Sequence, residues 1–183
     1  LEALLDRMEP YRSTGRILDI GCSAAFFLHV AKERGWKPQG AEIAKWAVDF
    51  SQKELGVDVF HGMLADAKFP DGHFDVVFSS HVMEHISQPS ELLREMVRVL
   101  RPGGAHVTVV PTQFASPTWK IARRFIGDPP PIHASFYTQR TYSAFLEKAG
   151  LQVVHSHYNI ELTRLPSLFI TEEQSLKKWR DRK

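Results

Sequence analysis

The chain has 183 residues, 43% of them apolar, a size at which a domain can bury a core without disulfide staples. Its 23 basic and 21 acidic residues give a net charge of +2, but five of the basic residues stand in the last seven positions. The remaining 18 basic and 20 acidic residues give no support to a nucleic-acid surface. The single cysteine, Cys22, excludes an internal disulfide and a multi-cysteine metal site and favours a reducing, cytoplasmic location. No apolar run approaches the ~20 residues of a membrane-spanning helix.

Short apolar runs alternate with amphipathic stretches along the chain. The amphipathic stretches predict helices over 1–8, 22–34, 45–55, 90–100 and 141–149. The apolar runs predict strands over 16–20, 39–43, 57–60, 74–78, 105–110 and 151–158. This alternation predicts an α/β, Rossmann-like, doubly wound fold with a mainly parallel sheet. In the helix over 22–34, the expected core residues are Ala25, Phe26, Leu28, Val30 and Ala31.

We expect one domain over 1–183, with a leading helix within 1–15 and a charged tail over 172–183. The segment 111–137 is too long for an ordinary connection after the fifth strand, and such insertions are usually functional. Within it, Trp119–Ile126 can form a short amphipathic helix. The simpler interpretation is a lid packed on an acceptor pocket, and the alternative is a membrane-surface helix that reaches a lipid-like acceptor.

Acidic residues and a glycine mark the ends of the first two predicted strands, the edge where open α/β sheets bind ligands. Glu42 follows Gly21 by about 20 residues, a spacing at which an acid commonly binds ribose hydroxyls, although a solvated charge is the alternative. Gly21 is the one glycine of a G-x-G-x-x-G pattern here, which argues against a dinucleotide. Asp19 beside this loop instead suits a cationic ligand or a free amino group.

Six further sequence motifs follow one another along the chain. They are Arg16–Cys22 with Phe27, Phe69–Val77, Val82–His85, Val99–Gly104, Pro130–His133 and Tyr142–Gly150. This ordered set, over roughly residues 10–158, resembles class I S-adenosylmethionine-dependent methyltransferases, in particular the subgroup that includes quinone-ring and many small-molecule enzymes. The resemblance implies transfer of a methyl group from S-adenosylmethionine to a small-molecule acceptor by in-line displacement.

The resemblance also implies roles for individual residues. Asp19 would hold the amino group of the methionine part, and the loop Gly21–Ser23, which includes Cys22, would approach that part closely. Glu42 would accept hydrogen bonds from both ribose hydroxyls. Around the adenine would lie Ile43, Met63 and Leu64.

Near the methyl group the resemblance implies a second set of residues. Ser80 and His81 would border the methionine tail and the transferring methyl. His133, after its proline pair, is the first candidate for a base or an acceptor-orienting group, with a lid hinge as the structural alternative. His81 is the second candidate.

Two features keep other functions open. Ser23 and Ala25 replace glycines of the family's first loop, and they would be strained if they had to adopt a left-handed conformation. A catalytically degenerate S-adenosylmethionine-binding module therefore remains an alternative. The sequence His81-Val-Met-Glu84-His85 also matches the H-x-x-E-H zinc pattern of a hydrolase, but it directly follows a strand and stops at Pro89, so we expect no metal.

Overall fold

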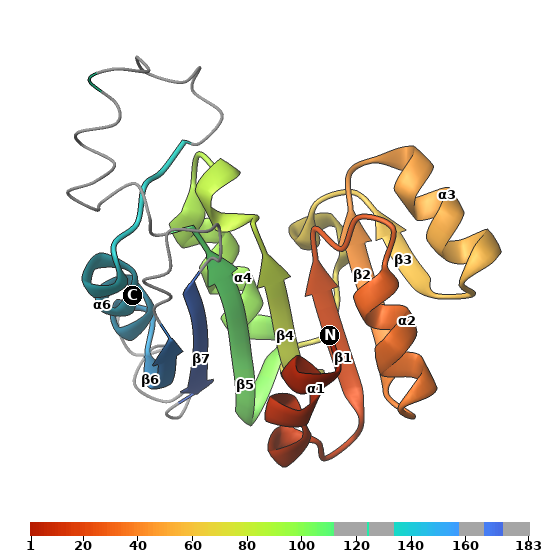
Figure 1. The fold of residues 1–183 in the computed structure, drawn as a ribbon, viewed down its shortest axis with the longest axis horizontal. Coiled ribbons are helices and arrows are strands. Elements are labelled where there is room, and N and C mark those ends of the chain that lie inside the picture. The colour runs from red at the N-terminus through yellow and green to blue at the C-terminus, as the bar shows by residue number, and fades with distance from the viewer. Residues whose placement is uncertain (112–123, 125–133, 158–166, 174–183) are drawn as a thin grey trace.

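A seven-stranded sheet lies at the centre of the computed structural model, which describes residues 1–111, 124, 134–157 and 167–173. Its strands are β1 (Arg16–Ile20), β2 (Lys37–Glu42), β3 (Asp58–His61), β4 (Phe74–Ser80), β5 (Leu100–Val110), β6 (Leu151–His157) and β7 (Ser167–Glu173). They lie in the order β3-β2-β1-β4-β5-β7-β6 (Figure 1). The pairs among the first five are parallel, whereas β7 runs antiparallel to both β5 and β6. The predicted mainly parallel, doubly wound sheet is confirmed.

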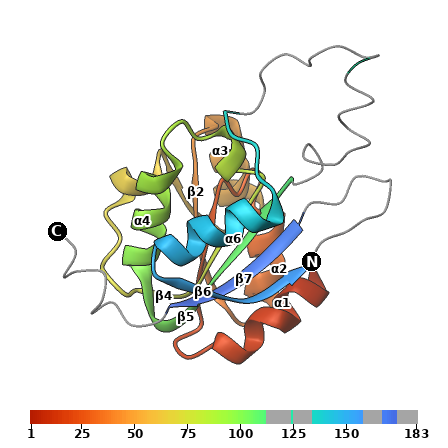
Figure 2. The same ribbon diagram turned by 90° about the vertical axis from the view of Figure 1, so that its left-hand side faces the viewer.

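Helices cover both faces of this sheet, because strands buried on both sides need apolar partners on each. One face carries α1 (Glu2–Met8), α2 (Phe26–Glu33) and α3 (Lys45–Glu54), and the other carries α4 (Pro89–Val99) and α6 (Gln139–Lys148). Figure 2 shows α4 on the opposite side of the sheet from α1 and α2. The short 3₁₀ helices are η1 (Glu9–Tyr11), η2 (Leu64–Ala67) and η3 (Met83–His85). No helix among the described residues is long and apolar enough to cross a membrane.

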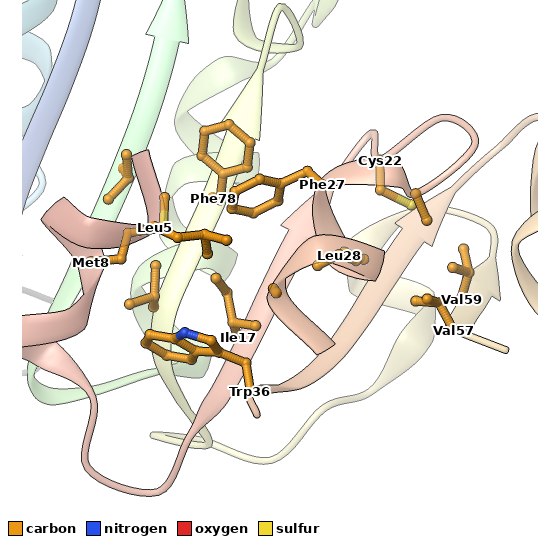
Figure 3. Close-up of a cluster of buried hydrophobic side chains, with 14 of the residues drawn as sticks. Leu5, Met8, Ile17, Cys22, Phe27, Leu28, Trp36, Val57, Val59 and Phe78 are labelled. Carbon is orange, nitrogen blue, oxygen red and sulfur yellow. The ribbon is translucent and has the colours of Figure 1, made fainter. Parts of the chain in front are cut away.

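The core beneath α1 and α2 explains why the first helix forms where the apolar spacing predicts it. Leu5 and Met8 of α1 are fully buried in this cluster, as Figure 3 shows. The rings of Phe27 and Phe78 lie 4.5 Å apart between centroids, which joins α2 to β4. Strands β1 and β4 are therefore packed firmly against the helices on this face of the sheet.

The starts of one helix and one strand were predicted wrongly, and one strand was missed. The helix predicted from Cys22 begins at Phe26, and Phe26 is 57% exposed while its neighbour Phe27 is buried. β5 begins at Leu100, which already pairs with Phe74, and residues 101–104 form an irregularity before the register resumes at Ala105. β7 was not predicted, and it completes the sheet between β5 and β6. Most of the predicted insertion over 111–137, with its amphipathic helix Trp119–Ile126 and His133, and most of the charged tail lie outside the described residues.

A buried aspartate anchors the segment that leads into β1. The Oδ2 atom of Asp75 accepts hydrogen bonds from the backbone N–H groups of Ser13, Thr14 and Gly15 at 2.9, 2.7 and 2.6 Å. Its Oδ1 atom accepts a hydrogen bond from Nε of Arg101 at 2.6 Å. Burial by itself would raise the pKa of Asp75, but these hydrogen bonds outweigh it and the pKa lies below its usual range. The entry to β1 is thus fixed by an ionised carboxylate.

Candidate functional site

The carboxyl ends of β1, β2 and β4 meet at one edge of the sheet (Figure 1). Ile20, near the end of β1, pairs with Ala41 of β2 and with Ser79 of β4. The chain order of the strands reverses direction between β1 and β4, and such a switch point is where open α/β sheets bind ligands. The residues that the sequence marks as site residues on these strands therefore do come together.

The loop after β1 is held in an unusual backbone conformation. Gly21 has φ +68°, and a Cβ atom at this position would lie 2.5 Å from Cγ2 of Val82, so a larger residue would clash with the segment after β4. Ser23 and Ala25 also have positive φ, 49° and 55°. Both residues thus adopt the left-handed conformation on which the expected strain depended, and that conformation costs roughly 1–2 kcal/mol for each non-glycine residue.

Replacing the exposed Ser23 with glycine should therefore stabilise the protein. Relief of about 1–2 kcal/mol of strain is partly offset by about 0.5–1 kcal/mol of extra entropy in the unfolded chain. We expect a net gain of about 0 to 1.5 kcal/mol in the free energy of unfolding, measured in urea. The control is Ser90→Gly in the first turn of α4, where φ is negative and the change should destabilise. Equal destabilisation by both changes would contradict the strain at Ser23.

The carboxylate of Glu42 is fixed at the end of β2 by backbone groups from two loops. It is 9% exposed. Its Oε2 accepts a hydrogen bond from the N–H of Ser23 at 2.9 Å, and its Oε1 accepts one from the N–H of Ala44 at 2.8 Å. Each carboxylate oxygen can accept a second hydrogen bond, so Glu42 can still accept hydrogen bonds from two donor groups of a ligand.

A second buried acid lies next to Glu42. Asp19 is 4% exposed, and burial together with the negative charge of Glu42 raises its pKa well above the usual range. A cationic ligand group would relieve this repulsion and favour the ionised form of Asp19. The arrangement therefore suits a ligand with an amino group, as the sequence predicts.

The Cys22 side chain belongs to the core. Its Sγ would lie 2.7 Å from a Cβ atom added at Gly40 of β2, and Figure 3 places Cys22 in the buried cluster. Burial, followed by the charges of Asp19 and Glu42, raises the thiol pKa, so the thiol stays protonated at neutral pH. Cys22 can therefore offer a ligand its backbone rather than a reactive thiolate.

The ends of β2 and β3 present apolar side chains to solvent. Ile43 is 67% exposed and Met63 is 48% exposed. The N–H of Gly62 donates to the backbone oxygen of Glu42 at 2.9 Å, which brings these two strand ends together. Leu64 differs. Its side chain is 2% exposed and lies in a second core cluster, which α4 and α6 form on the opposite face of the sheet, so only its backbone is available for a ligand contact.

The end of β4 carries a histidine paired with a buried glutamate. His81 follows Ser80 directly, has φ +56°, and donates its N–H to the backbone oxygen of Val109 at 2.9 Å. Its Nδ1 lies 3.2 Å from Oε1 of Glu84. The His81 side chain is 50% exposed, whereas that of Glu84 is 1% exposed. Sequence reasoning placed Glu84 in the motif Val82–His85 and in the zinc pattern but missed this pairing, although the spacing of three residues was a signal for it.

The backbone at the H-x-x-E-H motif is not the helix that the zinc pattern requires. The turn Met83–His85 is a single 3₁₀ turn, and His81 precedes it, so the two histidines do not share a helical face. Within the part of the chain that the structure describes, no three His, Cys, Asp or Glu side chains gather as a metal site.

Comparison with known proteins places the chain in a family. A family model described as a methyltransferase domain matches residues 1–156. A probable S-adenosylmethionine-dependent methyltransferase of Mycolicibacterium smegmatis is 29% identical over 147 residues, which cover 78% of this chain and 54% of that protein. The ajmaline N-methyltransferase of Rauvolfia serpentina is 33% identical over 105 residues, 52% of this chain and 35% of that enzyme. The chain thus spans about half or less of the length of these relatives.

Solved structures confirm the fold. An S-adenosylmethionine-dependent methyltransferase from Methanosarcina mazei superposes with a TM-score of 0.75 at 15% identity, covering 91% of this chain and 96% of that one. A methyltransferase from Listeria monocytogenes described as putative gives a TM-score of 0.72 at 17% identity, covering 93% and 97%. With its doubly wound sheet, its acids at the ends of β1 and β2 and the family match over 1–156, the chain belongs to the class I S-adenosylmethionine-dependent methyltransferases.

Proposed function

We propose that this chain binds S-adenosylmethionine at the ends of β1, β2 and β3 and transfers its methyl group to a small organic acceptor beside β4. The observation that carries the proposal is the pair of buried acids, Asp19 and Glu42, at the switch point of the sheet. Buried carboxylates are costly unless they are paired. A ligand with one ammonium group and two neighbouring hydroxyl groups would satisfy both acids.

The other side chains at this edge fit the same ligand. Asp19 would pair with the ammonium of the methionine part, and the two free acceptor positions of Glu42 would bind the ribose hydroxyls. The exposed apolar side chains of Ile43 and Met63 would contact the faces of the adenine ring. Burying that flat apolar surface is favourable, at about 25 cal/mol per Å².

The loop after β1 would approach the ligand through its backbone. The left-handed backbone of Gly21 brings this loop against Val82, just after β4, and Ser80 is the last residue of that strand. The backbone of Cys22 and that of Leu64 would complete the site. Side chains in these places are small or turned into the core, which leaves the ligand close access to the main chain.

The chemistry needs little more than alignment. When bound, S-adenosylmethionine supplies a sulfonium methyl group that is already a good electrophile. The chain's own residues then hold the acceptor in line with that methyl and exclude water. An acceptor that loses a proton on methylation also needs a base, and His81 is the candidate among the described residues. His133, which lies outside the described residues, stays a second candidate.

The proposed acceptor class rests on the relatives. A demethylmenaquinone methyltransferase from Listeria welshimeri is 30% identical over 118 residues, 57% of this chain and 48% of that protein. Together with the ajmaline enzyme, it indicates small organic acceptors of differing chemistry. A lipid-like quinol is one member of that class, and a hydroxyl-bearing aromatic acceptor is the first that we would test.

The test is methyl transfer from methyl-labelled S-adenosylmethionine to a panel of probes, namely a naphthoquinol, a malonyl thioester and an indoline alkaloid. We expect labelled product from at least one probe. For a probe whose attacking atom loses a proton, His81→Ala should lower the rate by about 10²–10⁴-fold because a general base contributes that much. Affinity for S-adenosylhomocysteine should not change. The matched control is His85→Ala, an exposed histidine four residues further along the chain, which should keep the wild-type rate.

The remaining outcomes separate the alternatives. Binding of S-adenosylhomocysteine with no product from any probe would favour a binding module without turnover, a role that the strain at Ser23 and Ala25 makes worth testing. An unchanged methyl-transfer rate in His81→Ala together with a large loss of rate in His133→Ala would identify His133 as the base. Loss of both the fold and cofactor binding in His81→Ala would assign His81 a structural role.

A further inference from the structure

Glu84 is a buried ionisable side chain that the fold does not require. Its backbone oxygen accepts hydrogen bonds from the N–H groups of Ala134 and Ser135 at 2.7 and 3.0 Å, which ties η3 to the segment before α6. Any residue at this position could make those two bonds. They leave the buried carboxylate itself unexplained, although glutamate is almost never fully buried unless it is paired.

The carboxylate of Glu84 is directed at His81. Its Oε1 lies 3.2 Å from Nδ1 of His81, while its Oε2 has no hydrogen-bond partner among the described residues. A buried carboxylate with so few partners costs several kcal/mol of stability. Such a cost is usual at functional sites, where a charge is needed to act on a neighbouring group.

The surroundings of Glu84 strengthen its effect on that neighbour. The ring of Tyr137 packs against Tyr142, with ring centroids 4.8 Å apart, and the Tyr137 hydroxyl donates to the backbone oxygen of Met83 at 3.5 Å. Burial raises the pKa of Tyr137, and the negative charge of Glu84 adds to this effect. Glu84 therefore acts on His81 from an environment with little water, where electrostatic interactions are stronger.

His81 contacts this buried acid and directly follows β4, whose carboxyl end borders the proposed site. Its ring is half exposed, although Nδ1 contacts the buried carboxylate. The next residue, Val82, lies so close to Gly21 that a Cβ atom on the glycine would clash with it. The left-handed backbone of His81 thus places an imidazole where the first cofactor loop meets the end of β4.

We propose, on the basis of the proposed function, that Glu84 is a positioning residue that makes His81 a general base. The carboxylate accepts the Nδ1–H of the neutral ring, so the lone pair resides on Nε2. The Nε2 atom takes the proton from the attacking atom of the acceptor as that atom bonds to the methyl carbon. The carbon–sulfur bond breaks, its electron pair stays on sulfur, and Glu84 stabilises the imidazolium until the proton passes to solvent. The acceptor class is one whose attacking atom loses a proton, such as a phenol or a quinol.

The first test is spectroscopic and needs neither cofactor nor acceptor. Nitrogen-15 chemical shifts of the His81 ring, measured in the ligand-free protein at alkaline pH, should report a proton on Nδ1 and none on Nε2. In Glu84→Gln the side-chain amide can donate as well as accept, so this preference should disappear. The control is Tyr137→Phe, which removes a neighbouring hydroxyl without touching the carboxylate and should leave the tautomer unchanged.

The second test is kinetic, with the most active probe whose attacking atom loses a proton. Glu84→Gln should lower kcat by about 10²–10⁴-fold with KM for S-adenosylmethionine unchanged, since the range is that of general base catalysis. Should Glu84→Gln fail to fold, Glu84→Met offers a second variant that removes the buried charge. Glu84→Met should be at least as stable as the wild type, and its kcat should be as low as that expected of Glu84→Gln.

The outcomes keep this inference apart from the proposed function. A proton on Nε2 of His81 in the wild type, or a tautomer that Glu84→Gln does not change, would overturn the role of Glu84 whether or not the protein methylates any probe. The expected tautomer in a protein that does not bind S-adenosylhomocysteine would instead leave the pairing standing and refute the proposed function.

Discussion

Glutamine in place of Glu42 is expected to weaken the binding of S-adenosylhomocysteine by about 10²–10³-fold. Each hydrogen bond to a charged group contributes about 1.5–3 kcal/mol, and two hydroxyl groups would donate to this carboxylate. The wild type should gain about 2.7 kcal/mol in free energy of unfolding at a ligand concentration of 100 times Kd. Glu42→Gln should gain almost none at that concentration, as measured by thermal or urea unfolding.

Without ligand, Glu42→Gln should also be less stable than the wild type. The carboxylate accepts hydrogen bonds from Ser23 and Ala44, and an amide oxygen can replace only one of its two oxygens. We expect a loss of about 1–3 kcal/mol without ligand, because one buried N–H loses its acceptor. The control is Glu54→Gln at the exposed end of α3, which should leave both quantities unchanged. Wild-type affinity in Glu42→Gln would contradict the ribose role of Glu42.

Asparagine in place of Asp75 is expected to lower the free energy of unfolding by about 3–5 kcal/mol at neutral pH. The change leaves Arg101 without its buried partner and removes one acceptor from the backbone turn before β1. The folded-state pKa of Asp75 is depressed, so its stabilising effect is present above the unfolded pKa and is lost as pH falls through the folded pKa. The difference between wild type and variant should therefore shrink in acid.

Asp19→Asn is the matched comparison, because both aspartates are buried but their pKa values move in opposite directions. A raised folded pKa means that the folded state holds the proton more tightly, so stability falls as pH rises from the unfolded to the folded value. At neutral pH, Asp19→Asn should thus be as stable as the wild type or more stable, while it binds S-adenosylhomocysteine poorly. A loss of stability equal to that of Asp75→Asn would contradict the electrostatic account of this edge.

The parts of the fold that sequence could predict are those set by local periodicity. The stripe of apolar residues in α1 and the buried run of β4 lead directly to a helix and to a strand. The start of α2 could not be placed this way, because Ser23 and Ala25 adopt left-handed conformations that neither residue prefers. The hydrogen bond from Ser23 to Glu42, 19 residues away, stabilises that loop, and local patterns do not contain such a contact.

The candidate site was predictable to a similar extent. Asp19, Gly21 and Glu42 follow from their positions at strand ends, since parallel strands end at one edge. The inward orientation of Cys22 and Leu64 depends on packing against Gly40 and the second core cluster, which spacing alone does not reveal. The pairing of His81 with Glu84 depends on a left-handed residue followed by a 3₁₀ turn, a geometry that the helix-based zinc pattern does not anticipate.

The most direct test of the central claim is a residue-resolved titration of the nitrogen-15-labelled chain with S-adenosylhomocysteine. If the cofactor binds at the switch point, the largest changes in amide chemical shift will fall on residues 21–25, 42–43 and 62–63 and saturate at one ligand per chain. The groove between α4 and α6, lined by Ser90, Arg94 and Lys148, should not respond. No saturable change at residues 21–25 and 42–43, or changes centred on that groove, would contradict the account.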